Sequence, residues 1–163
     1  MSVVGGLRPA DVIGHAPGVN SEQADSLVEG ITHWARLEPS IRALALAGSW
    51  ARGAAQPESD LDVLVLADPI EPWVQSDQWL RELAAMLGFR IDVVDLERWG
   101  VALSWRAWLA ADVELELTFA RPEWAAVDPI DEGSRRVVQD GLRVMVDKDG
   151  RLKRLQAVVV EGR

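Results

Sequence analysis

A turn of small residues and a pair of carboxylates lie close together in the sequence. Gly48-Ser49 ends an apolar segment, and ten residues separate it from Asp60-Leu61-Asp62. Because glycine carries no side chain, the backbone amides at such a turn can approach phosphate oxygens, and Ser49 adds a hydroxyl donor. Residues two apart on a strand share a face, so Asp60 and Asp62 project together. Two adjacent carboxylates repel unless a cation lies between them, and oxygen ligands beside phosphates favour Mg²⁺.

Further acids alternate with apolar residues downstream. Glu114 and Glu116 lie in the segment Val113-Glu114-Leu115-Glu116-Leu117, which predicts a strand with both acids on one face. One of them would complete a metal site with the aspartates, and the other would take a proton from a hydroxyl as a general base. Asp92, in a second apolar segment, is a rival third acid. The sequence leaves the choice among the three open.

Arg52 stands three residues after Ser49. A guanidinium there is within reach of triphosphate oxygens, which it binds as a planar fork. The alternative is a salt bridge to Glu58 or Asp60 that shapes the loop between the turn and the acids.

The order of these residues resembles the signature of the DNA polymerase beta-like nucleotidyltransferase superfamily. In that signature a hydrophobic residue, Gly, and Gly or Ser precede a strand of the form Asp-hydrophobic-acid-hydrophobic. The matching segments here are Ala47-Gly48-Ser49 and Asp60-Leu61-Asp62-Val63. Ala51-Arg52-Gly53 and Ser59 extend the match to the form seen in small "minimal" nucleotidyltransferases and in antibiotic-modifying relatives.

The resemblance covers residues 41–126 and implies an α/β (α+β) fold in which a mixed sheet of about five strands is flanked by helices. It also implies a role for each candidate residue. The nucleotide-binding candidates are Gly48, Ser49, Arg52 and Ser59; the catalytic candidates are Asp60, Asp62, Glu114 and Glu116; the metal ligands are Asp60, Asp62 and Glu116, with Asp92 as the alternative. Adenylyltransferases of the streptomycin/spectinomycin type carry a catalytic Glu in a Leu-Glu-Val strand, which by resemblance falls on Glu114.

The implied reaction is transfer of a nucleoside monophosphate from ATP, or from another nucleoside triphosphate, to a hydroxyl, assisted by two Mg²⁺ ions. The acceptor suggested by the antibiotic-modifying relatives is a small molecule of the aminoglycoside or lincosamide kind. A homodimer could supply a missing wall of its binding site. The alternative function is that of an antitoxin-type minimal nucleotidyltransferase, which binds and adenylylates a helical toxin partner.

The elements that must position these residues follow from periodicity and turn residues. We expect a helix from about 20 to 37, opened by Asn20 and Gln23, and another from about 77 to 87. We expect strands over 41–47, 60–66, 90–95, 103–109, 113–120 and 143–146, and a helix over 131–139. The basic segment Arg151–Arg154 predicts a solvated helix face or a mobile tail. The chain is expected to be one domain, 1–163, with an irregular lead-in over 1–19 and an extension over 127–163.

Composition narrows the function classes. The 163 residues are 48% hydrophobic, which suits one domain with a sizeable core. The net charge of −9 argues against nucleic-acid binding and suits a cationic small molecule or a protein partner. With no cysteine, disulfides and thiolate metal sites are excluded. No apolar run reaches about eighteen residues and the N-terminus lacks a signal pattern, so we expect a cytoplasmic protein that does not enter membranes.

Overall fold

The computed structural model describes residues 21–56, 59–109 and 113–162. The strands are β1 (Ile41–Ala47), β2 (Leu61–Ala67), β3 (Ile91–Trp99), β4 (Ala102–Leu109), β5 (Val113–Ala120) and β6 (Leu142–Asp147). The helices are α2 (Ser21–Leu37), α3 (Gly48–Ala51), α4 (Glu71–Val74), α5 (Gln78–Met86), α6 (Glu132–Asp140) and α7 (Arg151–Glu161), with a 3-10 turn, η1, over Pro122–Ala125. Asn20 of the expected capping box lies outside the described residues.

The strands form one mixed sheet in the order β3-β4-β5-β2-β1-β6. β2 and β5 run parallel, and the other neighbouring strands run antiparallel. β1 and β2 are buried over most of their length, which explains their near-continuous apolar sequences. The expected mixed sheet flanked by helices is confirmed. It has six strands rather than about five, because β6 joins its edge beside β1.

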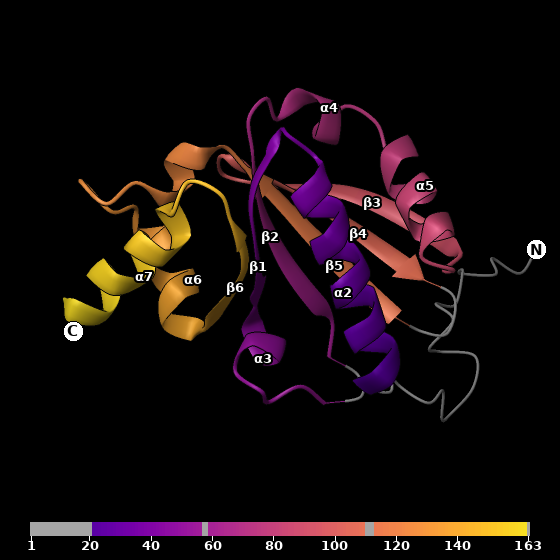
Figure 1. Cartoon of the computed structure of the whole chain (residues 1–163), viewed down its shortest axis with the longest axis horizontal. Helices are drawn as coiled ribbons and strands as arrows, with labels where there is room; N and C mark the ends of the chain where they lie inside the picture. Colours follow the sequence, from indigo (N-terminus) through magenta and orange to yellow (C-terminus); the bar gives the residue numbers. More distant parts are fainter. Residues whose placement is uncertain (1–20, 57–58, 110–112, 163) are drawn as a thin grey trace, which may run out of the picture.

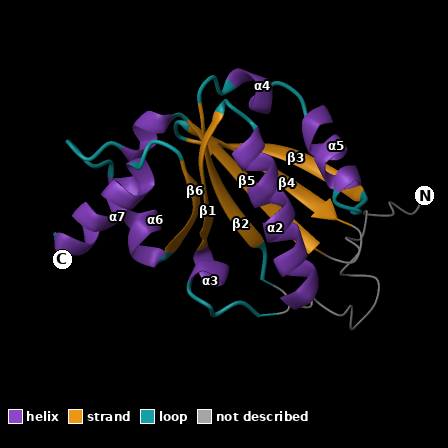
Figure 2. Ribbon diagram, viewed as in Figure 1, coloured by secondary structure: helices purple, strands orange, loops and turns teal. Residues whose placement is uncertain are grey.

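Helices cover the two faces of the sheet in different places (Figures 1 and 2). α2, α4 and α5 pack on one face, where residues such as Ile31, Leu80 and Phe119 form a continuous apolar core. η1, α6 and α7 pack on the other face, where Leu64, Val138 and Leu155 belong to a second core. Because side chains alternate along β2, Val63 faces the first core and Leu64 the second. Asp62 is therefore on the face covered by α6 and α7.

A cluster of aromatic rings fills the first core. The rings of Trp34 and Trp79 stack with their centroids 5.4 Å apart, and Trp73 meets both edge-on. The indole nitrogens of Trp79 and Trp105 both donate to the carbonyl of Trp73, so these polar atoms are satisfied inside the core. This cluster fixes α2, α4 and α5 against β4 and β5, and it lies on the face opposite the carboxylates.

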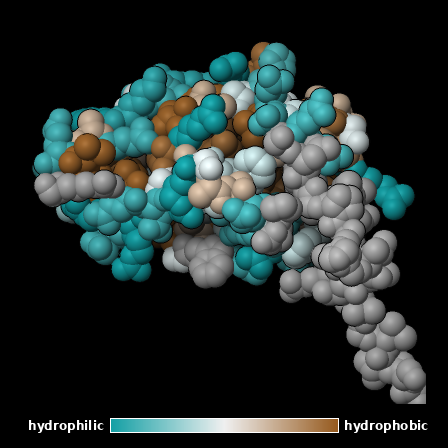
Figure 3. Space-filling model, turned by 90° about the horizontal axis from the view of Figure 1, so that it is seen from below, coloured by the Kyte–Doolittle hydropathy of each residue, from teal (hydrophilic) through white to brown (hydrophobic). Residues whose placement is uncertain are grey.

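The C-terminal segment is part of the packed structure. Leu152, Leu155 and Val159 of α7 are completely buried against the second core. Lys153 and Arg154 are exposed, so the basic segment is one solvated face of a docked helix rather than a tail. The surface seen from the side of α3 is mainly hydrophilic, with hydrophobic residues scattered among polar ones (Figure 3). No helix within the described ranges is long and apolar enough to cross a membrane.

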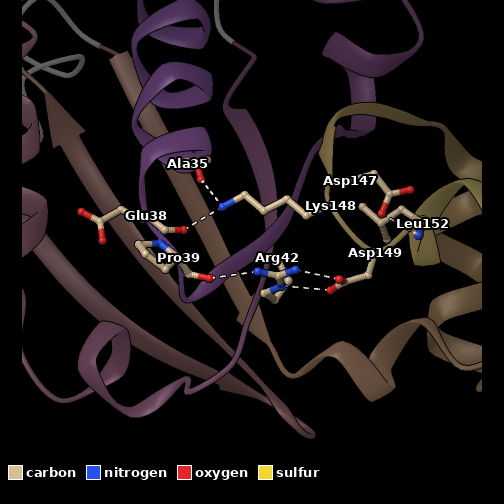
Figure 4. Close-up of polar contacts among 8 residues, drawn as sticks. All are labelled: Ala35, Glu38, Pro39, Arg42, Asp147, Lys148, Asp149 and Leu152. Carbon is tan, nitrogen blue, oxygen red and sulfur yellow. Dashed lines mark hydrogen bonds and ion pairs between the residues drawn. The ribbon is translucent and has the colours of Figure 1, made fainter.

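Lys148 connects the end of β6 to the end of α2 (Figure 4). Its Nζ donates to the carbonyls of Ala35, at 3.1 Å, and Glu38, at 2.8 Å. Beside it, Arg42 donates through Nε and Nη2 to both carboxylate oxygens of Asp149. Burial, followed by the charge of Arg42, lowers the pKa of Lys148. Lys148 thus pairs with the carbonyl of Ala35 in the last turn of α2 and adds a second donor to the carbonyl of Glu38, which also accepts from the amide of Ile41.

Replacing Lys148 by methionine is expected to lower the free energy of unfolding by about 1 kcal/mol, because two charge-assisted hydrogen bonds, to the carbonyls of Ala35 in α2 and of Glu38 after it, are lost while the aliphatic packing is kept. Urea denaturation followed by circular dichroism would measure the change. Lys153→Met, at an exposed position of α7, is the matched control and should leave stability nearly unchanged. Equal effects of the two substitutions would contradict this role of Lys148.

Candidate active site

The turn after β1 requires a glycine. Gly48 has a φ of +65°, a region that disfavours residues with a Cβ. A Cβ at this position would lie 2.9 Å from Oδ2 of Asp62. The first residue of α3 thus lies directly against the acid, and Ser49 follows in the same short helix. The local fold brings an open stretch of backbone beside a carboxylate.

Three carboxylates converge at this turn. The parallel pairing of β2 with β5 places Asp62 opposite Glu116, and Asp60 immediately precedes β2. Asp60, Asp62 and Glu116 each offer a carboxylate oxygen, and these oxygens all lie within 4.8 Å of one another. All three residues are half-buried. Such a group of oxygens is of the kind that holds a hard divalent cation.

Within the acidic cluster, the ionised form of Asp62 is disfavoured. Its burial, followed by the negative charges of Glu116 and Asp60, raises the pKa of its carboxyl to about 7. Its Oδ1 is buried and has no hydrogen-bond partner among the described residues. A buried oxygen without a donor costs free energy unless another group satisfies it. The unsatisfied oxygen, the like charges and the open turn beside them fit a bound divalent cation.

Glu114 lies on the same face of β5 but outside this group. Its Oε1 is 3.4 Å from Nε of Arg106, a residue of β4. The same guanidinium lies 3.8 Å from Glu116 and 3.5 Å from Glu97. Arg106 is therefore the cation that borders the acidic cluster on the β4 side. Its orientation follows from its register opposite Glu116, which the sequence does not reveal.

The other predicted residues are placed as follows. Nη1 of Arg52 donates to the carbonyl of Asp140 at the end of α6, at 2.9 Å, and its contact with triphosphate oxygens stays a prediction. Oγ of Ser59 accepts a hydrogen bond from the backbone amide of Gln56 and so shapes the loop before the acids. Glu58 lies outside the described residues. Asp92 is in β3, the edge strand that β4 and β5 separate from β2, so its backbone is not adjacent to the aspartate strand.

A cavity of about 650 Å³ adjoins the acids. Asp62 and Glu116 line one part of it, and Ser104 and Thr118 line another. α6 contributes Gly133 and Val137, so this helix forms part of its wall. The volume is typical of sites for small organic ligands. Sequence reasoning missed this cavity, because its walls come from strands and a helix that are far apart in the chain.

Comparison with known proteins finds a family match over part of the chain. Residues 29–108 match the family model described as polymerase beta, nucleotidyltransferase. Among curated proteins, none matches the sequence. The chain is also similar to the crystal structure of an aminoglycoside 6-adenyltransferase from Bacillus subtilis, with a TM-score of 0.48 and 16% identity over 66% of this chain. It spans only 37% of that protein's chain.

The matched residues contain β1, the Gly48 turn and the strand of Asp60 and Asp62. The match also extends through β4, and the six-stranded mixed sheet is of the architecture expected from the signature. Over residues 29–108 the chain matches the polymerase beta nucleotidyltransferase family, and its mixed α/β fold is consistent with the core of that superfamily.

Proposed function

We propose that the protein transfers a nucleoside monophosphate from a nucleoside triphosphate, most simply ATP, to a hydroxyl of a small molecule. The observation that carries this proposal is the convergence of Asp60, Asp62 and Glu116 within 4.8 Å beside the Gly48 turn. The cavity that opens from these acids supports a small acceptor. The alternative of a helical protein partner has no observation of its own in its favour.

Each group of residues has a distinct task in this reaction. The backbone at Gly48 and Ser49 binds the β- and γ-phosphates. Asp60, Asp62 and Glu116 would hold a divalent cation such as Mg²⁺, which, when bound, stabilises negative charge on the phosphate oxygens. The acceptor oxygen forms a bond to the α-phosphorus, and the bond from that phosphorus to the bridging oxygen breaks, which releases pyrophosphate.

The proton of the acceptor hydroxyl must pass to a base. Glu116 is placed to receive it, because it belongs to the acidic cluster and also lines the cavity. Glu114 does not line the cavity and instead faces Arg106. We therefore assign proton acceptance to Glu116. Glu114 and Arg106 set the electrostatic environment beside it.

Incubation with labelled ATP, Mg²⁺ and a panel of aminoglycosides and lincosamides tests the reaction. Release of pyrophosphate, together with a labelled acceptor, is the expected result. Calorimetric titration with Mn²⁺ and a non-hydrolysable ATP analogue tests the site independently of any acceptor. A protein that binds neither the cation nor the nucleotide would refute the proposal.

The two glutamates of β5 should respond differently to loss of charge. Glu116→Gln is expected to weaken Mn²⁺ binding by at least about tenfold, because it removes one of three converging carboxylates. Glu114→Gln removes the same charge from a position two residues before Glu116 on the same face of β5, outside that group, and should change the Mn²⁺ dissociation constant by no more than about threefold, a long-range electrostatic effect. Equal losses in the two variants would show that the geometry does not define the site.

A further inference from the structure

The cavity extends from the acids in one direction along the sheet. β1 and β2 pair Ala47 with Asp62, so Gly48 and α3 continue past Asp62 toward the start of β2. The cavity residues Leu64 and Thr118 are paired with each other one row further in the opposite direction, toward the end of β2. Ala47, Asp62 and Glu116 line the end of the cavity nearest the turn, and Gly48 and Ser49 are not among its lining residues in the described part of the chain.

The in-line geometry of phosphoryl transfer indicates from which side of the acids the acceptor hydroxyl approaches. The attacking and leaving oxygens lie roughly in line on opposite sides of the phosphorus. With the departing phosphates at Gly48 and Ser49, the acceptor hydroxyl must approach from the side opposite the turn. The cavity residues Leu64 and Thr118 are on that side. The departing phosphates therefore lie outside the cavity.

The chemistry of the walls limits what the acceptor can be. Side chains of Leu64, Val101, Ala102, Trp124 and Val137 line the cavity, and none of its lining residues in the described part of the chain is a lysine or an arginine. The acids among its described lining residues are Asp62 and Glu116 of the acidic cluster and Asp131, whose Oδ2 caps α6 by accepting from the amide of Ser134. An amine beside these acids could pair with them. Amines placed against the apolar walls would lose hydration without gaining a partner.

One polar feature lies between the apolar walls. Oγ of Ser104 and Oγ1 of Thr118 are 2.7 Å apart and share a hydrogen bond. Ser104 is buried, and Thr118 follows Glu116 by two residues on the same face of β5. This hydroxyl pair can orient one polar group of a ligand whose remaining surface is apolar.

We propose that the cavity holds the acceptor and selects a neutral or singly charged hydroxyl compound with an apolar body, in preference to a polycation with an amine on every ring. This inference rests on the proposed transfer reaction. It restricts the class of acceptor more than the net charge does. The overall charge of −9 favours cations in general, whereas the apolar residues of the cavity walls favour an apolar body.

The test measures binding of three probes to the full chain by calorimetry: lincomycin, the neutral alcohol 4-tert-butylcyclohexanol, and kanamycin. Ala102→Phe and Val137→Phe fill the cavity from β4 and from α6, so that one remains informative if the other fails to fold. Leu96→Phe, at an exposed position of β3 outside the cavity lining, is the matched control. Each protein is titrated separately with Mn²⁺ and a non-hydrolysable ATP analogue.

We expect lincomycin and the alcohol to bind more tightly than kanamycin. Each filling variant should weaken their binding at least about tenfold, while the control and all nucleotide affinities stay within about twofold. The inference is overturned if kanamycin binds as tightly as the other two, if neither apolar probe binds at millimolar concentration, or if filling the cavity weakens nucleotide instead of probe binding. Failure of the wild-type protein to bind Mn²⁺ and nucleotide would refute the proposed reaction, and the probe titrations without nucleotide would still decide the chemistry of the cavity.

Discussion

Asp62→Asn is expected to abolish pyrophosphate release and, in the metal-free protein, to raise thermal stability above neutral pH. Asparagine keeps the shape of the side chain but removes a charge that lies at the centre of the acidic cluster. The rate of release, to an acceptor or to water, should fall by at least about a hundredfold, the scale seen when a preorganised electrostatic group is lost. A coupled pyrophosphate assay would measure the loss of activity, and Mn²⁺ titration would measure the accompanying loss of cation binding.

The gain in stability has a defined pH dependence. Because burial and neighbouring charges raise the pKa of Asp62 to about 7 from its ordinary 3.8, ionisation of this group is harder in the folded state than in the unfolded one. Its contribution to folding is present below the unfolded pKa and is lost as the pH rises through the folded pKa. The Tm of the variant relative to the wild type should therefore rise between about pH 4 and about pH 7 and then level off.

Glu123→Gln removes the same charge from an exposed position of η1 and serves as the control. Its Tm difference from the wild type should not change over that range, and its activity should be retained. Full pyrophosphate release by Asp62→Asn would contradict the proposed mechanism. A Tm difference independent of pH would contradict the electrostatic account of the cluster.

Gly48→Ala is expected to weaken nucleotide and cation binding by about tenfold or more, which corresponds to about 1.4 kcal/mol. The new methyl group would lie 2.9 Å from Oδ2 of Asp62 and would separate the turn from the carboxylate that it adjoins. Calorimetric titration with Mn²⁺ and a non-hydrolysable ATP analogue would measure the loss, and thermal denaturation would measure the accompanying strain.

Gly53→Ala separates the two effects of the substitution. Gly53 has a φ of +67°, nearly that of Gly48, but a Cβ there meets nothing within 4 Å. Both variants should lose about 1 kcal/mol of stability through the left-handed backbone conformation, and only Gly48→Ala should also lose binding. Equal losses of binding would show that strain in the loop, rather than access to Asp62, explains the need for glycine.

Much of the fold could be predicted because its signals are local. The apolar segments of β1 and β2, the alternation in β5 and the amphipathic pattern of α2 lie within a few residues each, and they set the element boundaries closely. α7 was harder to interpret because its basic residues dominate the sequence there. Leu152, Leu155 and Val159 nevertheless recur at helical spacing, and this signal could have indicated the buried face.

The site could be predicted only in part, because register is not local. Alternation places Glu114 and Glu116 on one face, but only the pairing of β2 with β5 puts Glu116 opposite Asp62. The same holds for Arg106, whose position across from Glu116 depends on the pairing of β4 with β5. The role of Asp60, Asp62 and Glu116 as metal ligands stays a prediction, and the variants above test it.

The parallel pairing of β2 with β5 has a consequence for how the molecule assembles. β3, β4 and β5 are consecutive antiparallel strands, as are β1 and β2, so each group can form from contacts that are near in sequence. The two groups join along β2 and β5, and the aspartates and Glu116 come from opposite sides of that seam. A cation bound there would contact both groups of strands. It would therefore stabilise their association as well as serve the chemistry.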